Sequence, residues 1–170
     1  MQRSKIVLVC ACLGLALQAA HPQALTSKTA GEDSALTGHA KGTFDVTTTA
    51  LAPDEATGGP AIGRYALDKQ FHGDLEAASK GQMLAAGDPA KGAAGYVAME
   101  HVTGTLNGKR GEFAFQHNGA MDHSGLHLTV TVVPGSGTGE LAGIAGTMTI
   151  TIAAGKHSYD FEYTLPAAMQ

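Results

Sequence analysis

The sequence predicts an all-β protein whose strands close into an eight-stranded antiparallel barrel. From Gly42 onward, short runs of apolar, β-branched or aromatic residues are bounded by Gly, Pro, Asp or Asn at spacings of about 8–15 residues. Apolar and polar residues alternate within several runs, which is typical of strands with one buried face. Asn107-Gly108 lies between two runs and favours a hairpin turn with positive φ at both residues.

Eight strands are expected, in chain order at residues 42–51, 61–72, 74–85, 94–105, 109–118, 126–133, 144–153 and 156–165. The third range is the one that also resembles a helix, but Gly73 and Gly81 disfavour this alternative. An open sheet of eight strands leaves two exposed edges, and closure removes them. A closed barrel, lipocalin-like in shape, is therefore the expected architecture.

Alternation is clearest in the last three strands. Their apolar faces consist of Leu126, Leu128, Val130 and Val132; Met148, Ile150 and Ile152; and Tyr159, Phe161 and Tyr163. We expect each of these faces to point into one core.

The N-terminal region has the pattern of a secretory signal peptide. Arg3 and Lys5 precede an apolar run of about fifteen residues, shorter than the roughly 20 that a membrane-spanning helix needs. The expected organisation is a signal peptide at 1–20, a flexible linker at 21–40 and the barrel domain at 41–166. Cleavage is expected after Ala20, with Ala19 or Ala24 as alternatives, so the protein would be exported to the periplasm or the extracellular space.

Both cysteines, Cys10 and Cys12, lie within the predicted signal peptide, so the mature protein would contain no disulfide. Lipid attachment at Cys12 is disfavoured because the apolar stretch before it is only about six residues long. Removing Arg3 and Lys5 changes the formal net charge from −4 to −6. A mildly acidic domain without a basic stripe argues against nucleic acid or an anionic membrane surface as a partner. A small molecule or a protein is the expected partner, and the oligomeric state stays open.

The glycine-rich stretch 132–146, VVPGSGTGELAGIAG, is not expected to bind phosphate. Its glycines lack dinucleotide-binding spacing, no lysine lies between Ala120 and Gly155, and a Thr/Ile strand follows instead of a helix. It is expected to connect the sixth and seventh strands and to form part of a barrel rim.

No metal or other cofactor is predicted. His123 and His127 have a spacing that binds metal on a helix, but in a strand it separates them by roughly 13 Å. Residues 122–125 are instead expected to form a turn.

Two residues are candidates for acid–base chemistry. His117 continues the face of Phe113 and Phe115 and would project into the barrel near its mouth, where an imidazole can act as an acid or a base. The favoured alternative is a hydrogen-bonded histidine at a strand end without a chemical role. Glu100 shares a face with Tyr96 and Val102, but periodicity leaves open whether that face is inside. On the second strand, Arg64, Asp68, Gln70 and His72 are expected to face solvent.

Inward aromatic side chains are the candidates for ligand contact. They are Tyr96, Phe113, Phe115, Tyr159, Phe161 and Tyr163.

Several phrases of the sequence resemble one known family. They are GTFDV from 42, FHGDLEA at 71–77, MEHVTGTLNGKRGEFAFQHNG at 99–119 and the stretch at 132–146. In order and spacing they are similar to the bacterial domain-of-unknown-function family 3224 (DUF3224), from about Gly42 to Leu165. The resemblance implies a barrel like that of allene oxide cyclase, with no established activity and no catalytic residues to transfer.

The leading functional hypothesis is a small apolar or amphipathic ligand bound inside the barrel. A second hypothesis is a cyclase or isomerase in which Glu100 and His117 serve as acid and base. A third is a structural or protein-interaction module.

Overall fold

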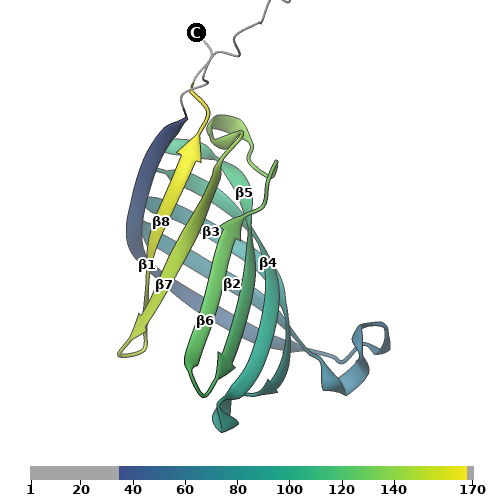
Figure 1. The fold of residues 1–170 in the computed structure, drawn as a ribbon. Coiled ribbons are helices and arrows are strands. Elements are labelled where there is room, and N and C mark those ends of the chain that lie inside the picture. The colour runs from purple at the N-terminus through teal and green to yellow at the C-terminus, as the bar shows by residue number, and fades with distance from the viewer. Residues whose placement is uncertain (1–34, 168–170) are drawn as a thin grey trace, which may run out of the picture. The chain divides into compact units, whose positions relative to one another are not determined.

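The protein forms a closed barrel of eight antiparallel strands that follow one another in chain order (Figure 1). The structure is a computed structural model and describes residues 35–167. The strands are β1 (Leu36–Leu51), β2 (Gly63–Gly73), β3 (Leu75–Asp88), β4 (Ala93–Leu106), β5 (Lys109–Asp122), β6 (Gly125–Val132), β7 (Ala145–Ala153) and β8 (Lys156–Leu165). The predicted fold class and all eight predicted strands are confirmed, including β3, for which a helix was the alternative.

The start of β1 differs from the prediction. The strand begins at Leu36 rather than at 42. Residues 36–40, part of the expected linker, pair with β8 from Leu36↔Leu165 to Ala40↔Phe161. Apolar residues are sparse there, but Ala40 is fully buried, and backbone pairing with β8 extends the strand. The predicted signal peptide and the linker up to residue 34 lie outside the described residues.

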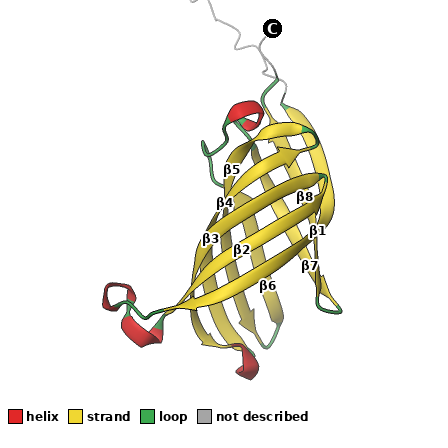
Figure 2. Ribbon diagram, turned by 180° about the vertical axis from the view of Figure 1, so that it is seen from behind, coloured by secondary structure: helices red, strands yellow, loops and turns green. Residues whose placement is uncertain are grey.

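The connections between strands alternate between two ends of the barrel, and 3₁₀ turns lie at both ends (Figure 2). We call one end the closed end. It carries the turns at 73–74 and 107–108 and the connection 133–144, which includes the 3₁₀ turn η4 (Gly139–Leu141). The other is the open end, with the connection 52–62, the turn around η3 (Pro89–Lys91) and the turns at 123–124 and 154–155.

Aromatic and aliphatic side chains fill the interior toward the closed end. Phe113 stacks on Phe161 with 5.9 Å between ring centroids, and Phe115 packs edge-on against Phe161 at 5.2 Å. The largest fully buried apolar side chains of this core are Phe71, Leu75, Val102, Leu106, Phe113, Phe115, Val130, Leu141, Ile144 and Phe161. Burial of this apolar area is the main favourable contribution to folding.

The glycine-rich stretch is the predicted connection between the sixth and seventh strands, and it covers the closed end. Leu141 and Ile144 are buried, and Ser136 Oγ accepts a hydrogen bond from the backbone N–H of Ala114 (3.0 Å). A side chain at Gly111 would clash with the carbonyl of Thr138 at 2.2 Å, so this glycine permits the close approach.

The predicted Asn107-Gly108 turn is confirmed, with φ values of 47° and 79°. The Asn107 amide also donates to the carbonyl of His39 (3.0 Å) and to the Tyr163 hydroxyl (2.9 Å), and so ties the turn to β1 and β8.

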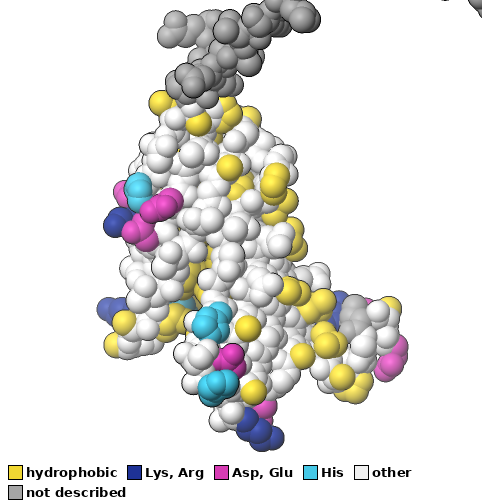
Figure 3. Space-filling model, in the orientation of Figure 1, with side chains coloured by type: hydrophobic (Ala, Val, Ile, Leu, Met, Phe, Trp, Pro, Cys, Tyr) yellow, Lys and Arg dark blue, Asp and Glu magenta, His cyan; other side chains and the backbone are white. Residues whose placement is uncertain are grey.

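Several ion pairs lie on the outer wall of the barrel. Charged and histidine side chains form small groups on the face shown in Figure 3. Lys41 Nζ lies 2.7 Å from Asp160, and Lys80 Nζ donates to Asp68 at 2.5 Å. Asp68, Gln70 and His72 are exposed and Arg64 is half-buried, as expected for the solvent face of β2. Within residues 35–167, no helix is long or apolar enough to cross a membrane.

Candidate functional site: a cavity at the open end and a buried polar cluster

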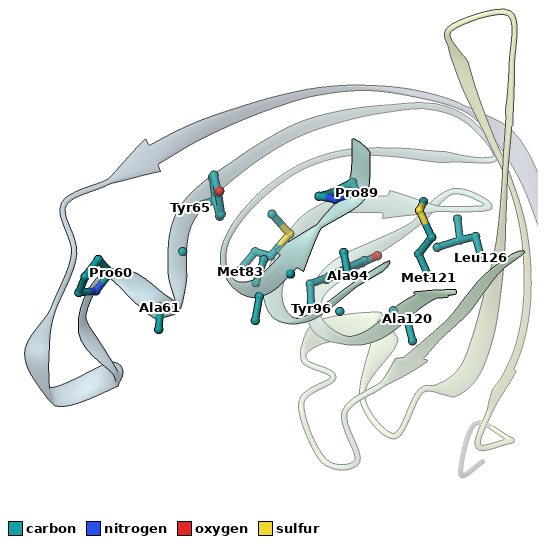
Figure 4. A pocket seen from close by; sticks show the side chains of 16 residues that line it. Pro60, Ala61, Tyr65, Met83, Pro89, Ala94, Tyr96, Ala120, Met121 and Leu126 are labelled. Atoms are coloured by element: carbon teal, nitrogen blue, oxygen red, sulfur yellow. The ribbon is translucent and has the colours of Figure 1, made fainter. Parts of the chain in front are cut away.

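A cavity of about 510 Å³ occupies the open end of the barrel (Figure 4). It is lined by residues of β2 to β6 and by Pro60, Ala61 and Pro89 from the connections. The large lining side chains are Tyr65, Met83, Tyr96, Met121 and Leu126.

Small residues create this space. Glycine and alanine take lining positions where the closed end has phenylalanine and leucine, at Gly63, Ala85, Ala94 and Gly119. The barrel therefore has one filled half and one hollow half, although the same inward–outward alternation runs through both.

The lining is mostly apolar, with two tyrosines as its large polar side chains. Tyr65 and Tyr96 are both half-buried. Burial raises the pKa of Tyr96, and the nearby negative charge of Glu100 raises this pKa further. Tyr96 therefore remains a neutral phenol that can donate a hydrogen bond.

A cluster of four polar side chains lies deeper in the barrel, one each from β2, β3, β4 and β5. Lys69, Ser79, Glu100 and His117 are all less than 10% exposed. Lys69 Nζ donates to Glu100 Oε2 (2.5 Å) and Ser79 Oγ donates to Glu100 Oε1 (2.7 Å). His117 Nε2 lies 3.2 Å from Glu100 Oε2 but outside hydrogen-bond geometry, and this nitrogen has no partner among the described residues.

Glu100 is held as a carboxylate. Burial by itself raises its pKa, but contact with His117, the charge and hydrogen bond of Lys69 and the hydrogen bond from Ser79 together lower the pKa to about 2. The Lys69 ammonium also lies over the rings of Phe44 (5.0 Å) and Phe71 (5.7 Å), where the electron-rich ring faces attract a cation.

The cluster lies next to the cavity, one step along the strands toward the closed end. On β5, Met121 and Gly119 line the cavity and His117 is the next inward residue; on β3, Met83 lines it and Gly81 separates it from Ser79. The Tyr96 ring covers Gly119, because a Cβ atom there would lie 2.2 Å from the ring.

Glu100 and His117, the two predicted acid–base candidates, both point into the barrel and meet there. The structure thus decides that the face of β4 with Tyr96, Glu100 and Val102 is the interior one. Among the predicted ligand-contacting aromatics, Tyr96 lines the cavity.

The other five predicted aromatics occupy the filled core. Their rings pack against one another or against neighbouring rings, and all are at most 7% exposed. The reason is their position: Phe113, Phe115, Tyr159, Phe161 and Tyr163 lie on the closed-end side of the polar cluster, where large residues from every strand converge.

Lys69 and Ser79 were missed by the sequence analysis. Lys69 lies between Leu67 and Phe71 at inward spacing, so strict alternation along β2 already places this charge inside. Ser79 likewise follows Leu75 and Ala77 on the inward side of β3.

The segment 122–125 forms the predicted turn between β5 and β6. Ser124 donates from its backbone N–H to Asp122 (2.7 Å), and its hydroxyl lies 2.8 Å from His127 Nε2. In the described part of the chain, no three His, Cys, Asp or Glu side chains come together as a metal-binding group.

Fold and site define the class of protein: a closed eight-stranded antiparallel barrel with a packed half, a hollow half and a buried ion pair between them. Residues 40–163 match the family described as "Protein of unknown function (DUF3224)". The fold is similar to a crystal structure of a DUF3224 protein of unknown function from Shewanella oneidensis MR-1, with 47% sequence identity and a TM-score of 0.67. That match covers 75% of this chain and 97% of the other. The chain therefore belongs to the DUF3224 family, as its sequence phrases predicted. A search of the curated proteins finds no match.

Proposed function

We propose that this protein binds a small apolar or amphipathic molecule in the cavity at its open end. The observation that carries the proposal is a cavity of about 510 Å³ with a mostly apolar lining and two tyrosine hydroxyls. Sites for small molecules are typically concave, roughly 300–1,000 Å³ in volume, and lined by apolar side chains with few polar groups.

The architecture supports this proposal because the hollow half is not needed to complete the core. The buried aromatic and aliphatic side chains at the closed end already form a continuous core in their half of the barrel. Apolar side chains at the open end remain partly exposed, as at Leu126 (52%), and a bound apolar molecule would remove this surface from water.

A tryptophan placed in the cavity tests the proposal. The chain contains no tryptophan, so Met83→Trp adds a single tryptophan, which can be excited selectively and also reduces the cavity volume. Gln82→Trp is the matched control, because residue 82 is the adjacent, exposed position of the same strand.

The full chain would be analysed by native mass spectrometry and solvent extraction, and then titrated with decan-1-ol. We expect an extractable small molecule or a saturable fluorescence change in Met83→Trp and none in Gln82→Trp. An empty protein with equal, non-saturating responses in both variants would contradict ligand binding.

The buried cluster favours a second candidate function, isomerisation or cyclisation of an apolar substrate. A carboxylate and an imidazole within 3.2 Å of each other inside the barrel are groups that can move protons on a bound molecule. To test this, wild-type protein and His117→Phe would each be incubated with a cellular lipid extract. Chromatography coupled to mass spectrometry would show a compound that changes retention but not mass in the wild type alone; identical profiles would contradict catalysis.

We also propose export of the mature protein, on the basis of the charged and apolar segments within residues 1–20. Expression of the full chain in a Gram-negative host followed by N-terminal sequencing of the periplasmic fraction tests this. A mature terminus near His21 is expected, and an intact Met1 terminus in the cytosol would contradict it.

A further inference from the structure

His117 Nε2 lies in the interior of the barrel, 3.2 Å from Glu100 Oε2 but outside hydrogen-bond geometry. The residue is 4% exposed, and its Nε2 has no hydrogen-bond partner among the described residues. A buried polar atom without a partner is costly, and such atoms are rare in folded proteins. A bound molecule that reaches His117 would supply the missing hydrogen bond.

Small residues lie between the cavity lining and the polar cluster. Gly119 lies between Met121 and His117 on β5, Gly81 lies between Met83 and Ser79 on β3, and Ala98 lies between Tyr96 and Glu100 on β4. The Tyr96 ring, which rests over Gly119, therefore separates the cavity from the imidazole. Tyr96 is half-buried at the cavity lining, so a ligand that reaches His117 would displace its ring.

The charges of the cluster select among polar groups. The charges of Lys69 and Glu100 compensate each other, so this pair supplies no net positive charge for an anion. Glu100 itself is an ionised carboxylate 3.2 Å from His117 Nε2. A second carboxylate at this point would be repelled in a region of low dielectric, whereas an uncharged group would not.

We propose that the ligand is a neutral amphipathic molecule, with an apolar body in the cavity and a hydroxyl or carbonyl group hydrogen-bonded to His117 Nε2. This inference rests on the proposed ligand-binding function and specifies its chemistry. Alcohols and ketones are therefore expected to bind more tightly than fatty acids of the same chain length.

Four ten-carbon probes test the proposal: decan-1-ol, decan-2-one, decanoate and decane. Their binding to the full chain would be measured by calorimetry at neutral pH. The alcohol or the ketone should bind about fivefold or more tightly than both decane and decanoate, the gain expected of one hydrogen bond to a buried partner.

His117→Phe removes the ring nitrogens while keeping an aromatic ring of similar size, and it should abolish this preference. His101→Phe is the matched control, since His101 is an exposed residue of β4 and should leave the preference unchanged. If no probe binds the wild type, the proposed function fails together with this inference. If the probes bind but decanoate binds as well as the alcohol, or if the preference survives in His117→Phe, ligand binding stands and this inference is overturned.

A measurement on the wild type keeps the test independent of whether His117→Phe folds. In ¹⁵N-labelled protein, decan-2-one or decan-1-ol should shift the Nε2 resonance of His117 and leave that of His101 in place. Saturating probe with an unmoved His117 resonance would also overturn the inference.

Discussion

Glu100 is the residue at which three other buried polar side chains meet. Its carboxylate accepts from Lys69 and Ser79 and contacts His117, so it neutralises an ammonium that the barrel encloses. A paired buried charge contributes modestly to stability, but an unpaired one is strongly unfavourable. The effect of a substitution at Glu100 therefore depends on whether the Lys69 ammonium keeps a counter-charge.

Glu100→Gln should destabilise the protein by about 3–5 kcal/mol, because Lys69 would remain buried without a counter-charge. The double variant Lys69→Met/Glu100→Gln should recover a large part of this loss. Urea unfolding measures both. Asp68→Asn is the control: it breaks the exposed pair with Lys80 and should cost less than about 1 kcal/mol. Equal effects of Glu100→Gln and Asp68→Asn would contradict the role given to the buried pair.

The pKa of Glu100 also predicts a pH dependence of stability. The pKa of Glu100 in the folded protein is about 2, below the ordinary value of 4.5. The ionised carboxylate therefore stabilises the folded protein above pH 4.5, and this stabilisation is lost as the pH falls from 4.5 toward 2. This contribution is on the order of 3 kcal/mol. Unfolding free energies measured between pH 2.5 and 6 should fall more steeply for wild type than for Glu100→Gln. Parallel curves would show that Glu100 titrates normally in the folded state.

At the scale of elements, the hairpin turns show how local sequence and tertiary contact combine. The β4–β5 and β7–β8 turns have nearly the same backbone, with φ of 47° and 79° at Asn107-Gly108 and 49° and 75° at Ala154-Gly155. Asparagine tolerates positive φ and alanine does not, so the second turn is strained where the first is relaxed. Asn107 in addition bonds to two other strands.

The two turns should respond to substitution in opposite directions. Asn107→Ala should destabilise the protein by about 1–3 kcal/mol, through loss of its hydrogen bonds and strain at positive φ. Ala154→Asn should stabilise it by up to about 1 kcal/mol, because the strain is relieved. Thermal unfolding of each single variant checks the signs, and a stabilising Asn107→Ala would contradict this account.

Neighbouring strand pairs also differ in how many residues they pair. β5 and β6 pair from Phe115↔Val132 to Asp122↔Gly125, whereas the aligned pair between β6 and β7 in the described chain is Thr131↔Thr147. The barrel is therefore held least by backbone pairing at β6–β7, on the side where Leu126 of the cavity and Ile152 (57% exposed) face water.

At the scale of the whole molecule, the stabilising core and the proposed binding cavity lie in different halves of one barrel. The closed end carries the aromatic core and the covering segment with Leu141 and Ile144. The open end carries the cavity. The buried Lys69–Glu100 ion pair lies between the aromatic core and the cavity.

This division predicts different costs for truncation in the two halves. Phe161→Ala, in the fully buried core, should destabilise the protein by about 3–5 kcal/mol through the cavity it creates. Met121→Ala, at the lining of an existing cavity, should cost less than about 2 kcal/mol. Denaturant unfolding compares the two, and a Met121→Ala loss as large as that of Phe161→Ala would mean that the open end is part of the stabilising core.

The fold could be predicted from the sequence because its signals are local. Alternation in 126–132 and 156–165, the glycines at turns and Asn107-Gly108 each act over a few residues, and together they predicted the eight strands, the Asn107-Gly108 hairpin and a closed antiparallel barrel. Alternation also determined that His117 points inward, and applied strictly to β2 it would have placed Lys69 there too. The start of β1 was harder, because residues 36–40 carry little apolar pattern and form a strand through pairing with β8.

The tertiary structure alone decided which of the inward residues form a site. Both faces of 94–105 are equally apolar, so the local pattern could not orient Glu100. Its contacts are with Lys69, Ser79 and His117, which lie on three other strands and 17 to 31 residues away along the chain. Nor could alternation separate core aromatics from cavity aromatics, because every inward position looks the same along a single strand. What separates Phe161 from Tyr96 is the side chains that the neighbouring strands bring to the same level of the barrel: phenylalanines around one, glycines and alanines around the other.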